Sequence, residues 1–230
     1  MLTGINVNNI TTRMLDGWPL ENNININRYW RETGGKPDNE VNKLLQIYYG
    51  DGKGKTTAAL GLAMRAAGHG YKVRIIQFMK GNAYSGELAS ASKLGIEMFQ
   101  FGRSCPQADL IKSGVMECDN CGQCWISREG ITALDKKKTD MGWQLVQDSL
   151  QEGQADILIL DEILHALDLG LLAEEKLIGW LQQVPAVPEI ILTGRKVSPE
   201  LIAMADLVSE IRKIKHPYEQ GIKARRGIEY

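Results

Sequence analysis

Short apolar runs alternate with longer amphipathic segments from Leu44 to the C-terminus. Apolar runs rich in β-branched residues are typical of buried strands, whereas apolar residues spaced three or four apart predict helices. Strands are expected at Leu44–Tyr49, Val73–Phe78, Ile96–Phe101, Ile157–Leu160, Ile190–Leu192 and Leu207–Ile211. Helices are expected at Thr57–Ala67, Gly86–Lys93, about Ile131–Gln151, Leu171–Gln183 and Pro199–Ala205. This alternation predicts an α/β fold: a mostly parallel sheet with helices on both faces and a ligand site at the carboxyl ends of the strands.

The first 42 residues do not share this alternation. Seven asparagines lie between Asn6 and Asn27, with little helical or strand periodicity. We interpret residues 1–42 as an N-terminal extension or arm, and residues 43–230 as one domain with a cysteine-rich insert at about residues 102–128. The arm also contains aromatic and apolar residues, which argue against complete disorder and favour its docking on the domain or on a partner subunit. These residues are Trp18, Leu20, Tyr29 and Trp30.

The first expected strand leads into the segment GDGKGKTT, Gly50 to Thr57. A glycine-rich turn leaves backbone N–H groups uncovered, and the alanine-rich helix after it directs the positive end of its dipole to the same place. The segment is therefore suited to bind a phosphate group. The usual phosphate loop reads G-x-x-x-x-G-K-S/T, with lysine on the terminal phosphates and the hydroxyl on Mg²⁺. This loop is one residue shorter, because the first glycine of the pattern would fall on Tyr49. The alternative, a flexible surface turn, is disfavoured by the flanking strand and helix.

Two carboxylates follow another expected strand. The run DILILDEIL places Asp161 and Glu162 after a buried strand, at the edge of the sheet where the phosphate loop lies. Mg²⁺ takes oxygen ligands, so Thr56 together with Asp161 or Glu162 would hold it. The alternative is an acidic pair that only stabilises the N-terminus of the next helix.

A third strand end carries an arginine. The run ILTGR places Thr193, Gly194 and Arg195 at the same edge of the sheet. A guanidinium there can pair with two phosphate oxygens at once. The alternative is an exposed arginine that pairs with a surface acid.

Composition limits the remaining classes. The 230 residues are 43% hydrophobic and carry a net charge of −1, which suits one α/β core with an appendage and points to neither nucleic-acid nor membrane-surface binding. No basic stretch leads into an apolar leader and no apolar run reaches membrane-spanning length, so we expect a cytoplasmic protein. In that compartment the four cysteines are expected to be reduced or bound to metal.

Together and in order, these motifs resemble the ATP:corrinoid adenosyltransferases, or cob(I)alamin adenosyltransferases, of the phosphate-loop type. The matching stretches are GDGKGKTTAALGLAMRAAGHG, QFMKG followed by GE, LILDEI, ILTGR, ADLVSE and KHPYEQGIKARRGIEY. They span roughly Leu45 to Tyr230 apart from the cysteine-rich segment, and they are far more specific than a phosphate loop alone. The resemblance implies a three-layer sandwich like that of the phosphate-loop NTPases (RecA-like).

The resemblance also implies a reaction. The 5′-deoxyadenosyl group of ATP is transferred to the cobalt(I) of a reduced corrinoid, and triphosphate is released. The loop would hold ATP in the reverse sense to ordinary phosphate-loop enzymes, so that the ribose C5′ faces cobalt. Because cobalt(I) is already a strong nucleophile, catalysis reduces to positioning the substrates and stabilising charge on the departing triphosphate, with Mg²⁺ as cofactor.

By the same resemblance, residues at matching positions receive roles. The candidate catalytic residues are Lys55, Thr56, Glu162 and Arg195. The nucleotide-binding set is Gly50, Asp51, Gly52, Lys53, Gly54, Lys55, Thr56, Thr57, Arg65 and Arg195, and the Mg²⁺ set is Thr56, Asp161 and Glu162. Asp51 departs from the asparagine common in the family, and a carboxylate near phosphates needs a compensating cation.

The segment FGRSCPQADLIKSGVMECDNCGQCWISREG leaves the family pattern. Cys118, Cys121 and Cys124 have the spacing C-x2-C-x2-C, and Cys105 precedes Pro106. Zinc sites normally pair two separated C-x2-C turns, whereas three closely spaced cysteines and a remote Cys-Pro resemble the run of bacterial ferredoxins. We therefore favour a four-iron (4Fe–4S) iron–sulfur cluster over Zn²⁺, and a metal-free thiol cluster is the remaining alternative.

Trp125 directly follows Cys124. By resemblance, it is a displaced counterpart of aromatic residues that lie over the corrinoid. A metal at the cysteines would then order the corrinoid-facing loop, and an iron centre would offer an electron a route to cobalt.

The basic tail is expected, by resemblance, to fold back to the nucleotide, and a solvated tail is the alternative. Its cations are Lys213, Lys215, Lys223, Arg225 and Arg226. His216 precedes Pro217 and should be extended or in a turn. We expect His69 to end a helix and His165 to lie on the helix after the acidic pair, and we assign neither a catalytic role.

Two other functions stay open. An ATP-hydrolysing switch or kinase would use the same loop and carboxylates, and a non-catalytic binding module would bind ATP and a corrinoid and convert neither. For the transferase we expect a reducing flavoprotein or another electron donor as partner, and neither nucleic acid nor membrane. The resemblance suggests a homodimer in which the arm covers the neighbour's site.

Overall fold

The computed structural model describes residues 44–81, 85–119, 121–149, 155–183 and 188–228. All of them belong to one unit of the chain, Pro37–Tyr230. The expected arm, residues 1–42, lies outside the described residues, and its docking stays a prediction.

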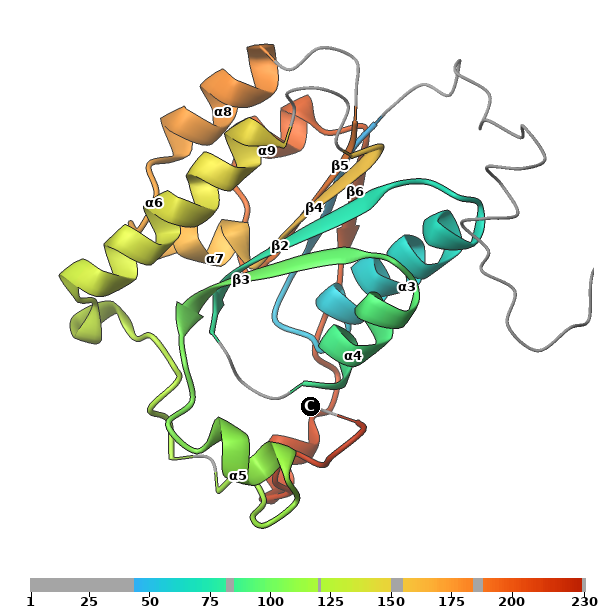
Figure 1. Cartoon of the computed structure of the whole chain (residues 1–230). Helices are drawn as coiled ribbons and strands as arrows, with labels where there is room; N and C mark the ends of the chain where they lie inside the picture. Colours follow the sequence, from blue (N-terminus) through green and yellow to red (C-terminus); the bar gives the residue numbers. More distant parts are fainter. Residues whose placement is uncertain (1–43, 82–84, 120, 150–154, 184–187, 229–230) are drawn as a thin grey trace, which may run out of the picture. The chain divides into compact units, whose positions relative to one another are not determined.

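Six strands of the described chain form one sheet in the order β3-β2-β4-β5-β1-β6 (Figure 1). Every neighbouring pair is parallel, which confirms the predicted α/β fold. Four strands (β2, β3, β4 and β5) run past the ends that the apolar pattern predicts, because the last residues of these strands are polar or glycine. The strands are β1 (Leu45–Tyr49), β2 (Val73–Lys80), β3 (Glu97–Arg103), β4 (Ile157–Asp161), β5 (Glu189–Gly194) and β6 (Leu207–Glu210).

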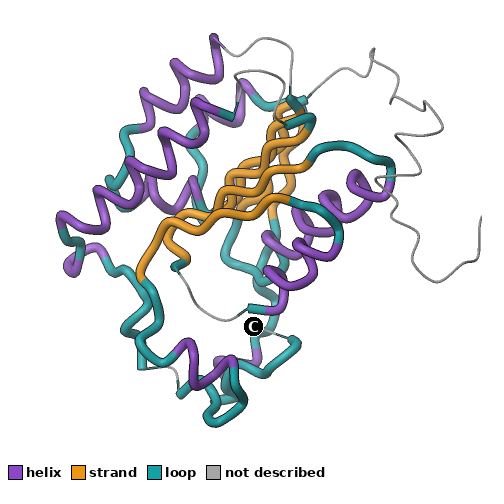
Figure 2. Tube along the Cα trace, viewed as in Figure 1, coloured by secondary structure: helices purple, strands orange, loops and turns teal. Residues whose placement is uncertain are grey.

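The expected helices connect these strands in the predicted order, and one short helix, Ala108–Lys112, was not predicted (Figure 2). They are α3 (Lys55–Gly68), α4 (Gly86–Lys93), α5 (Ala108–Lys112), α6 (Ala133–Asp148), α7 (Ile163–Asp168), α8 (Glu174–Gln183) and α9 (Pro199–Met204). Short 3₁₀ turns occur at η1 (Arg128–Gly130) and η3 (Pro217–Gln220). Across the described ranges, no helix has the length and apolar character needed to cross a membrane.

Two helix starts differ from the apolar pattern for identifiable reasons. The start of α6 is set by a capping box, in which the Thr132 side chain accepts from the Asp135 backbone N–H and the Asp135 carboxylate accepts from the Thr132 N–H. The predicted start of α8 at Leu171 is wrong. Leu171 and Leu172 are buried in the connection before the helix, so their apolar character reflects the core and not a helical face.

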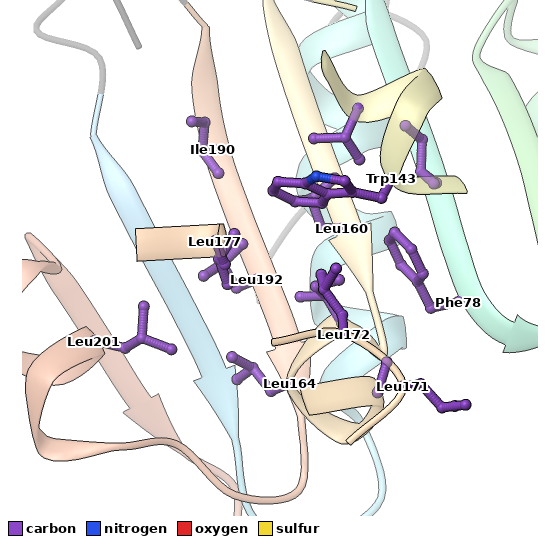
Figure 3. Packing of buried hydrophobic residues seen from close by; sticks show 14 of the residues in the cluster. Phe78, Trp143, Leu160, Leu164, Leu171, Leu172, Leu177, Ile190, Leu192 and Leu201 are labelled. Carbon is purple, nitrogen blue, oxygen red and sulfur yellow. The ribbon is translucent and has the colours of Figure 1, made fainter. Parts of the chain in front are cut away.

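The core has two layers, one on each face of the sheet. Helices α6, α7, α8 and α9 cover one face, and α3 and α4 cover the other (Figure 1). Alternation along β4 supplies both layers: Ile157 and Ile159 pack with the alanines of α3, and Leu158 and Leu160 pack in the cluster with α6 to α9. Figure 3 shows Trp143 beside Leu160 and Phe78 in that second layer. Both faces of the inner strands β2, β4 and β5 are therefore buried, which leaves the carboxyl edge of the sheet for chemistry.

Candidate active site

The phosphate loop connects β1 to α3 and lies against the C-terminal segment of the chain. The Gly50 N–H donates to Gly194 O at 3.2 Å, and the Gly52 N–H donates to Ile211 O at 2.8 Å. A Cβ atom on Gly52 would lie 2.7 Å from that oxygen. Gly50 and Gly54 have φ values of 121° and 125°, a region that favours glycine. The loop therefore needs glycine at these positions for close approach and for backbone conformation.

A cavity of about 530 Å³ opens where this loop meets the ends of β2 and β4. It receives the N-terminus of α3, whose unpaired N–H groups and dipole favour an anion. The described residues that line it are Lys53, Gly54, Lys55, Thr56, Thr57, Leu60, Lys80, Gly86, Glu87, Ser90, Glu162, Gly227 and Ile228. The predicted loop residues and Glu162 thus meet in one cavity.

Lys55 is folded back onto its own loop. Its ammonium donates to Gly50 O at 2.8 Å and to Gly52 O at 2.7 Å, and the residue is 9% exposed. Burial lowers the pKa of Lys55, with the nearby Glu162 carboxylate acting in the opposite direction. A phosphate in the cavity would offer this ammonium stronger, charged acceptors than two carbonyl oxygens.

Asp161 is the centre of a buried polar network. Its carboxylate accepts from Thr56 Oγ1 at 2.8 Å and from Thr193 Oγ1 at 2.7 Å. It also accepts from Gln77 Nε2 at 2.9 Å and from Lys80 Nζ at 3.0 Å. Burial alone would raise the pKa of Asp161, but Lys80 and these hydrogen bonds outweigh it and hold that pKa below its usual value. The ionised carboxylate therefore fixes the hydroxyl of Thr56 at the mouth of the loop.

Glu162 differs from its neighbour in backbone and in surroundings. It has a φ of 60° and precedes α7, and its N–H donates to Thr193 Oγ1 at 2.9 Å. Its Oε2 is buried and, within the described residues, has no hydrogen-bond partner. Burial, and then the charge of Asp161, raise the pKa of Glu162. A carboxylate oxygen that is buried beside the cavity without a donor is suited to receive a cation.

Sequence reasoning missed two partners of Asp161 at the end of β2. Lys80 bridges Asp161 at 3.0 Å and Glu87 at 3.9 Å, and Gln77 is fully buried. Burial by itself would lower the pKa of Lys80, but Asp161 and Glu87 raise it. Polar residues at a strand end fall outside the apolar pattern, and the only signal for them was the QFMKG motif that contains both.

Two predicted nucleotide-binding arginines lie elsewhere. Arg195 is exposed after β5, with its guanidinium carbon 5.4 Å from the centre of the Trp125 ring, which is in turn 6.1 Å from the His165 ring. Arg65 is exposed on α3 near the phenol of Tyr48. Neither is among the described residues that line the cavity, and their contacts with nucleotide stay predictions.

The C-terminal segment folds back to the site, as the resemblance implied. Gly227 and Ile228 line the cavity, and the Ile211 N–H donates to Tyr49 O at 2.7 Å. Asp51 has a defined role in this contact. Its Oδ1 accepts from the Lys213 N–H at 2.9 Å, and this hydrogen bond lowers the pKa of Asp51. The carboxylate thus ties the loop to the tail.

The three histidines lie where the sequence predicts. His69 ends α3, His165 lies in α7, and His216 is extended before Pro217, with φ −134° and ψ 132°. His165 is half-buried against Trp125, and burial followed by Arg195 lowers its pKa. None of the three is among the described residues that line the cavity, and that they have no catalytic role stays a prediction.

The four cysteines lie in the connection between β3 and α6, and none of them forms a disulfide with another described residue. Cys121 is exposed and the other three are half-buried. Within the part of the chain that the structure describes, no group of three or more His, Cys, Asp or Glu side chains is arranged so that it could hold a metal ion. The expected iron–sulfur or zinc site therefore stays a prediction, as does the Mg²⁺ site.

Comparison with known proteins agrees with this geometry. The family model for "ATP:corrinoid adenosyltransferase BtuR/CobO/CobP" matches residues 41–230. A corrinoid adenosyltransferase of Pseudomonas aeruginosa is 33% identical over 81% of this chain and 83% of its own length. That of Escherichia coli K12 is 34% identical over 81% and 85%, and the corrinoid adenosyltransferase CobA of Salmonella typhimurium is 34% identical over 83% and 87%. The chain belongs to the ATP:corrinoid adenosyltransferase family.

Proposed function

We propose that this chain transfers the 5′-deoxyadenosyl group of ATP to the cobalt(I) of a reduced corrinoid and releases triphosphate. The observation that carries the proposal is the match of the family model across residues 41–230, which include the short phosphate loop and the tail that meet at one cavity. The volume of about 530 Å³ lies in the range usual for small-molecule sites.

The loop binds the triphosphate of ATP. The backbone N–H groups at the start of α3 face the cavity, and Lys53 and Lys55 supply positive charge. Lys55 exchanges its two carbonyl contacts for phosphate oxygens when the nucleotide enters. Because the ammonium already lies within the loop, this exchange needs only a change of side-chain torsion.

The residues present fit a magnesium ion. The unpartnered Oε2 of Glu162 and the hydroxyl of Thr56 are hard oxygen donors beside the cavity. Asp161 acts mainly through Thr56, because four protein donors already occupy its carboxylate. When bound, Mg²⁺ supplies charge neutralisation to the triphosphate.

The chemical step is a displacement at carbon. Cobalt(I) donates an electron pair to the ribose C5′, the cobalt–carbon bond forms, and the C5′–O bond breaks with its electrons on the triphosphate oxygen. Lys55 and the α3 N-terminus stabilise the charge on this leaving group. The chain needs no general base, because the cobalt(I) nucleophile carries no proton. The protein orients the C5′ atom and keeps other nucleophiles, such as water, from accepting the adenosyl group.

We also propose a separate electron donor, a reducing flavoprotein or a protein of similar chemistry, because cobalt must be in the reduced state to attack. A homodimer in which the arm covers the neighbour's site is a further part of the proposal, and it rests on the resemblance alone. Deleting residues 1–40 should weaken substrate binding and leave the sheet and helices of residues 44–228 folded. Unchanged affinity for ATP and corrinoid in the deletion variant would contradict the role of the arm.

An anaerobic assay tests the function. Purified chain, ATP, Mg²⁺, cobalamin and a strong chemical reductant are combined, and the cobalt–carbon bond is followed by its light-sensitive absorbance. We expect product with the unmodified chain and a large loss of rate in Lys55→Ala. Lys196→Ala, which changes an exposed lysine paired with Asp168 outside the cavity, is the matched control and should keep its rate. Hydrolysis of ATP to ADP without a cobalt–carbon product would favour the switch or kinase, and binding of both ligands without turnover would favour a carrier.

A further inference from the structure

The end of β2 carries a lysine to which the mechanism above gives no role. Lys80 lines the cavity, as do Lys53 and Lys55 of the phosphate loop. In the sheet, β2 is separated from β1 by β4 and β5, so Lys80 reaches the cavity from a different side than the loop does (Figure 1). The cavity therefore has a second source of positive charge, whose use calls for an explanation.

A break in the strand turns Lys80 toward the cavity. Side chains alternate between the two faces of a strand, and along β2 Ile76 and Phe78 pack in the layer with α6 to α9. Met79 should face the opposite layer, yet it packs against the same layer as Phe78. Met79 has a φ of 64°, and Lys80 after it lies on the side of the cavity and α4. In a regular strand Lys80 would instead face α6 to α9, away from the cavity.

The break is strained, and the neighbouring strand leaves room for it. Among the described residues, the non-glycine residues with a positive φ are Met79 and Glu162, which lie at the ends of the adjacent strands β2 and β4. Gly102 of β3 pairs with Met79, and a Cβ atom on Gly102 would lie 2.3 Å from the Met79 carbonyl carbon. A left-handed non-glycine residue costs energy, and such residues cluster at active sites. The conformation of Met79 thus points to a use for Lys80.

Lys80 keeps donors for a ligand. Within the described residues its ammonium makes one hydrogen bond, to Asp161 Oδ2 at 3.0 Å, whereas the Glu87 carboxylate is 3.9 Å away. An ammonium has three N–H donors, so two remain. The other oxygen of Asp161, Oδ1, accepts from Thr56 at the start of α3. Because one carboxylate holds both groups, the ammonium lies close to the hydroxyl at the mouth of the phosphate loop.

We propose that Lys80 contacts the triphosphate of bound ATP directly and keeps this contact as triphosphate leaves. The inference rests on the proposed adenosyl transfer, in which a strongly anionic group departs. Lys55 and the N-terminus of α3 act on that group from the loop, and Lys80 acts from β2, so the anion is held between two sources of positive charge. The Glu87 carboxylate also lines the cavity, and the Lys80 ammonium offsets its repulsion of the phosphates.

Binding of inorganic triphosphate to the full chain tests the contact without corrinoid and without turnover. Calorimetry is carried out with Mg²⁺ present. We expect Lys80→Met to weaken triphosphate binding by about 10- to 100-fold, because a charge-assisted hydrogen bond is lost, and Lys80→Arg to recover most of the affinity. Lys196→Met, at an exposed lysine paired with Asp168 outside the cavity, is the matched control and should bind like the unmodified chain.

A double variant separates direct contact from charge compensation. If Lys80 only offset the charge of Glu87, Lys80→Met combined with Glu87→Gln would recover the affinity of the unmodified chain, and that result would overturn the contact. Direct contact predicts that the double variant stays weak. Unchanged affinity in Lys80→Met alone would also overturn it. A chain that binds triphosphate through Lys80 but forms no cobalt–carbon bond would contradict the proposed function and leave the contact intact.

The unmodified chain gives a second readout, because loss of Lys80 can destabilise the buried Asp161. Lysines are acetylated with a limiting amount of acetic anhydride, with and without triphosphate, and the modified peptides are quantified by mass spectrometry. Triphosphate should lower the modification of Lys80 and leave that of Lys196 unchanged. Equal modification of Lys80 in the two samples would overturn the contact.

Discussion

Thr193 supports both acidic residues of the candidate site, and its replacement by valine gives a quantitative test of that network. The side chain is completely buried. Its hydroxyl donates to Asp161 at 2.7 Å and accepts from the Glu162 N–H at 2.9 Å. Thr193→Val keeps nearly the same volume, so the change removes two hydrogen bonds without opening a cavity. The perturbation is therefore electrostatic.

The expected loss follows from the two contacts. A hydrogen bond to an ionised carboxylate contributes about 1.5–3 kcal/mol, and an N–H left without a partner costs about 1–3 kcal/mol. We therefore expect Thr193→Val to lower the free energy of unfolding by about 3–5 kcal/mol, a large part of the roughly 5–15 kcal/mol of a typical domain. Binding of ATP with Mg²⁺ should weaken as well, because Asp161 would hold Thr56 less firmly.

Urea denaturation followed by circular dichroism measures this loss, with the midpoint lowered and the slope unchanged. Thr193→Ser is the control. It keeps the hydroxyl, loses one methyl group and should cost only about 1 kcal/mol. A valine variant within 1 kcal/mol of the unmodified chain, or a serine variant as unstable as the valine variant, would refute the role given to the hydroxyl.

Three further changes test other parts of the site. Gly52→Ala places a methyl group against the C-terminal segment, so it should lower the free energy of unfolding by about 1–3 kcal/mol and weaken ATP binding measured by calorimetry. Gly61→Ala, at an open position of α3, should instead raise the free energy of unfolding by about 0.5–1 kcal/mol. Equal effects of the two variants would contradict the close packing of Gly52. Burial and Asp161 raise the pKa of Glu162 in the folded chain, so ionisation of this carboxyl opposes folding as the pH rises above about 4.3. Glu162→Gln should therefore raise the free energy of unfolding, and urea titrations should show that this gain grows from pH 4 to pH 7. A gain independent of pH would argue against the raised pKa. The Arg103 guanidinium holds the pKa of Asp135 well below its usual range. The ion pair therefore stabilises the folded chain at a pH above the pKa that Asp135 has in the unfolded chain, and this contribution is lost on acidification. Arg103→Met should lower the urea midpoint more at pH 7 than near pH 3, and a larger effect near pH 3 would exclude the ion pair as the source of the stabilisation.

The apolar pattern was sufficient for the sheet and insufficient at its polar edge. Apolar runs located all six described strands. The inner strands are apolar because both of their faces are covered, whereas the edge strands β3 and β6 are much less buried and still carry apolar residues. The same rule stopped β2 at Phe78 and left out Lys80, whose ammonium is held by the distant Asp161. A partner from another strand has no local signature, so only the folded chain could reveal this pair.

The candidate site shows a similar division. The glycine pattern and the strand-loop-helix order identified Lys55 and Thr56, because phosphate binding by backbone N–H groups imposes a local sequence. The role of Asp51 required the fold, since its partner is the backbone of Lys213, far along the chain. The cysteine spacing suggested a metal, but within the described residues the folded chain does not arrange the cysteines as a metal site.

The fate of the ribose carbon tests the central claim most directly. ATP labelled with ¹³C at C5′ is incubated without oxygen with the chain, Mg²⁺ and reduced cobalamin, and ¹³C and ³¹P spectra are recorded in the dark. The account predicts a ¹³C signal of carbon bound to cobalt, with one triphosphate for each label transferred. Label that stays in nucleotide while ADP and phosphate accumulate would contradict it.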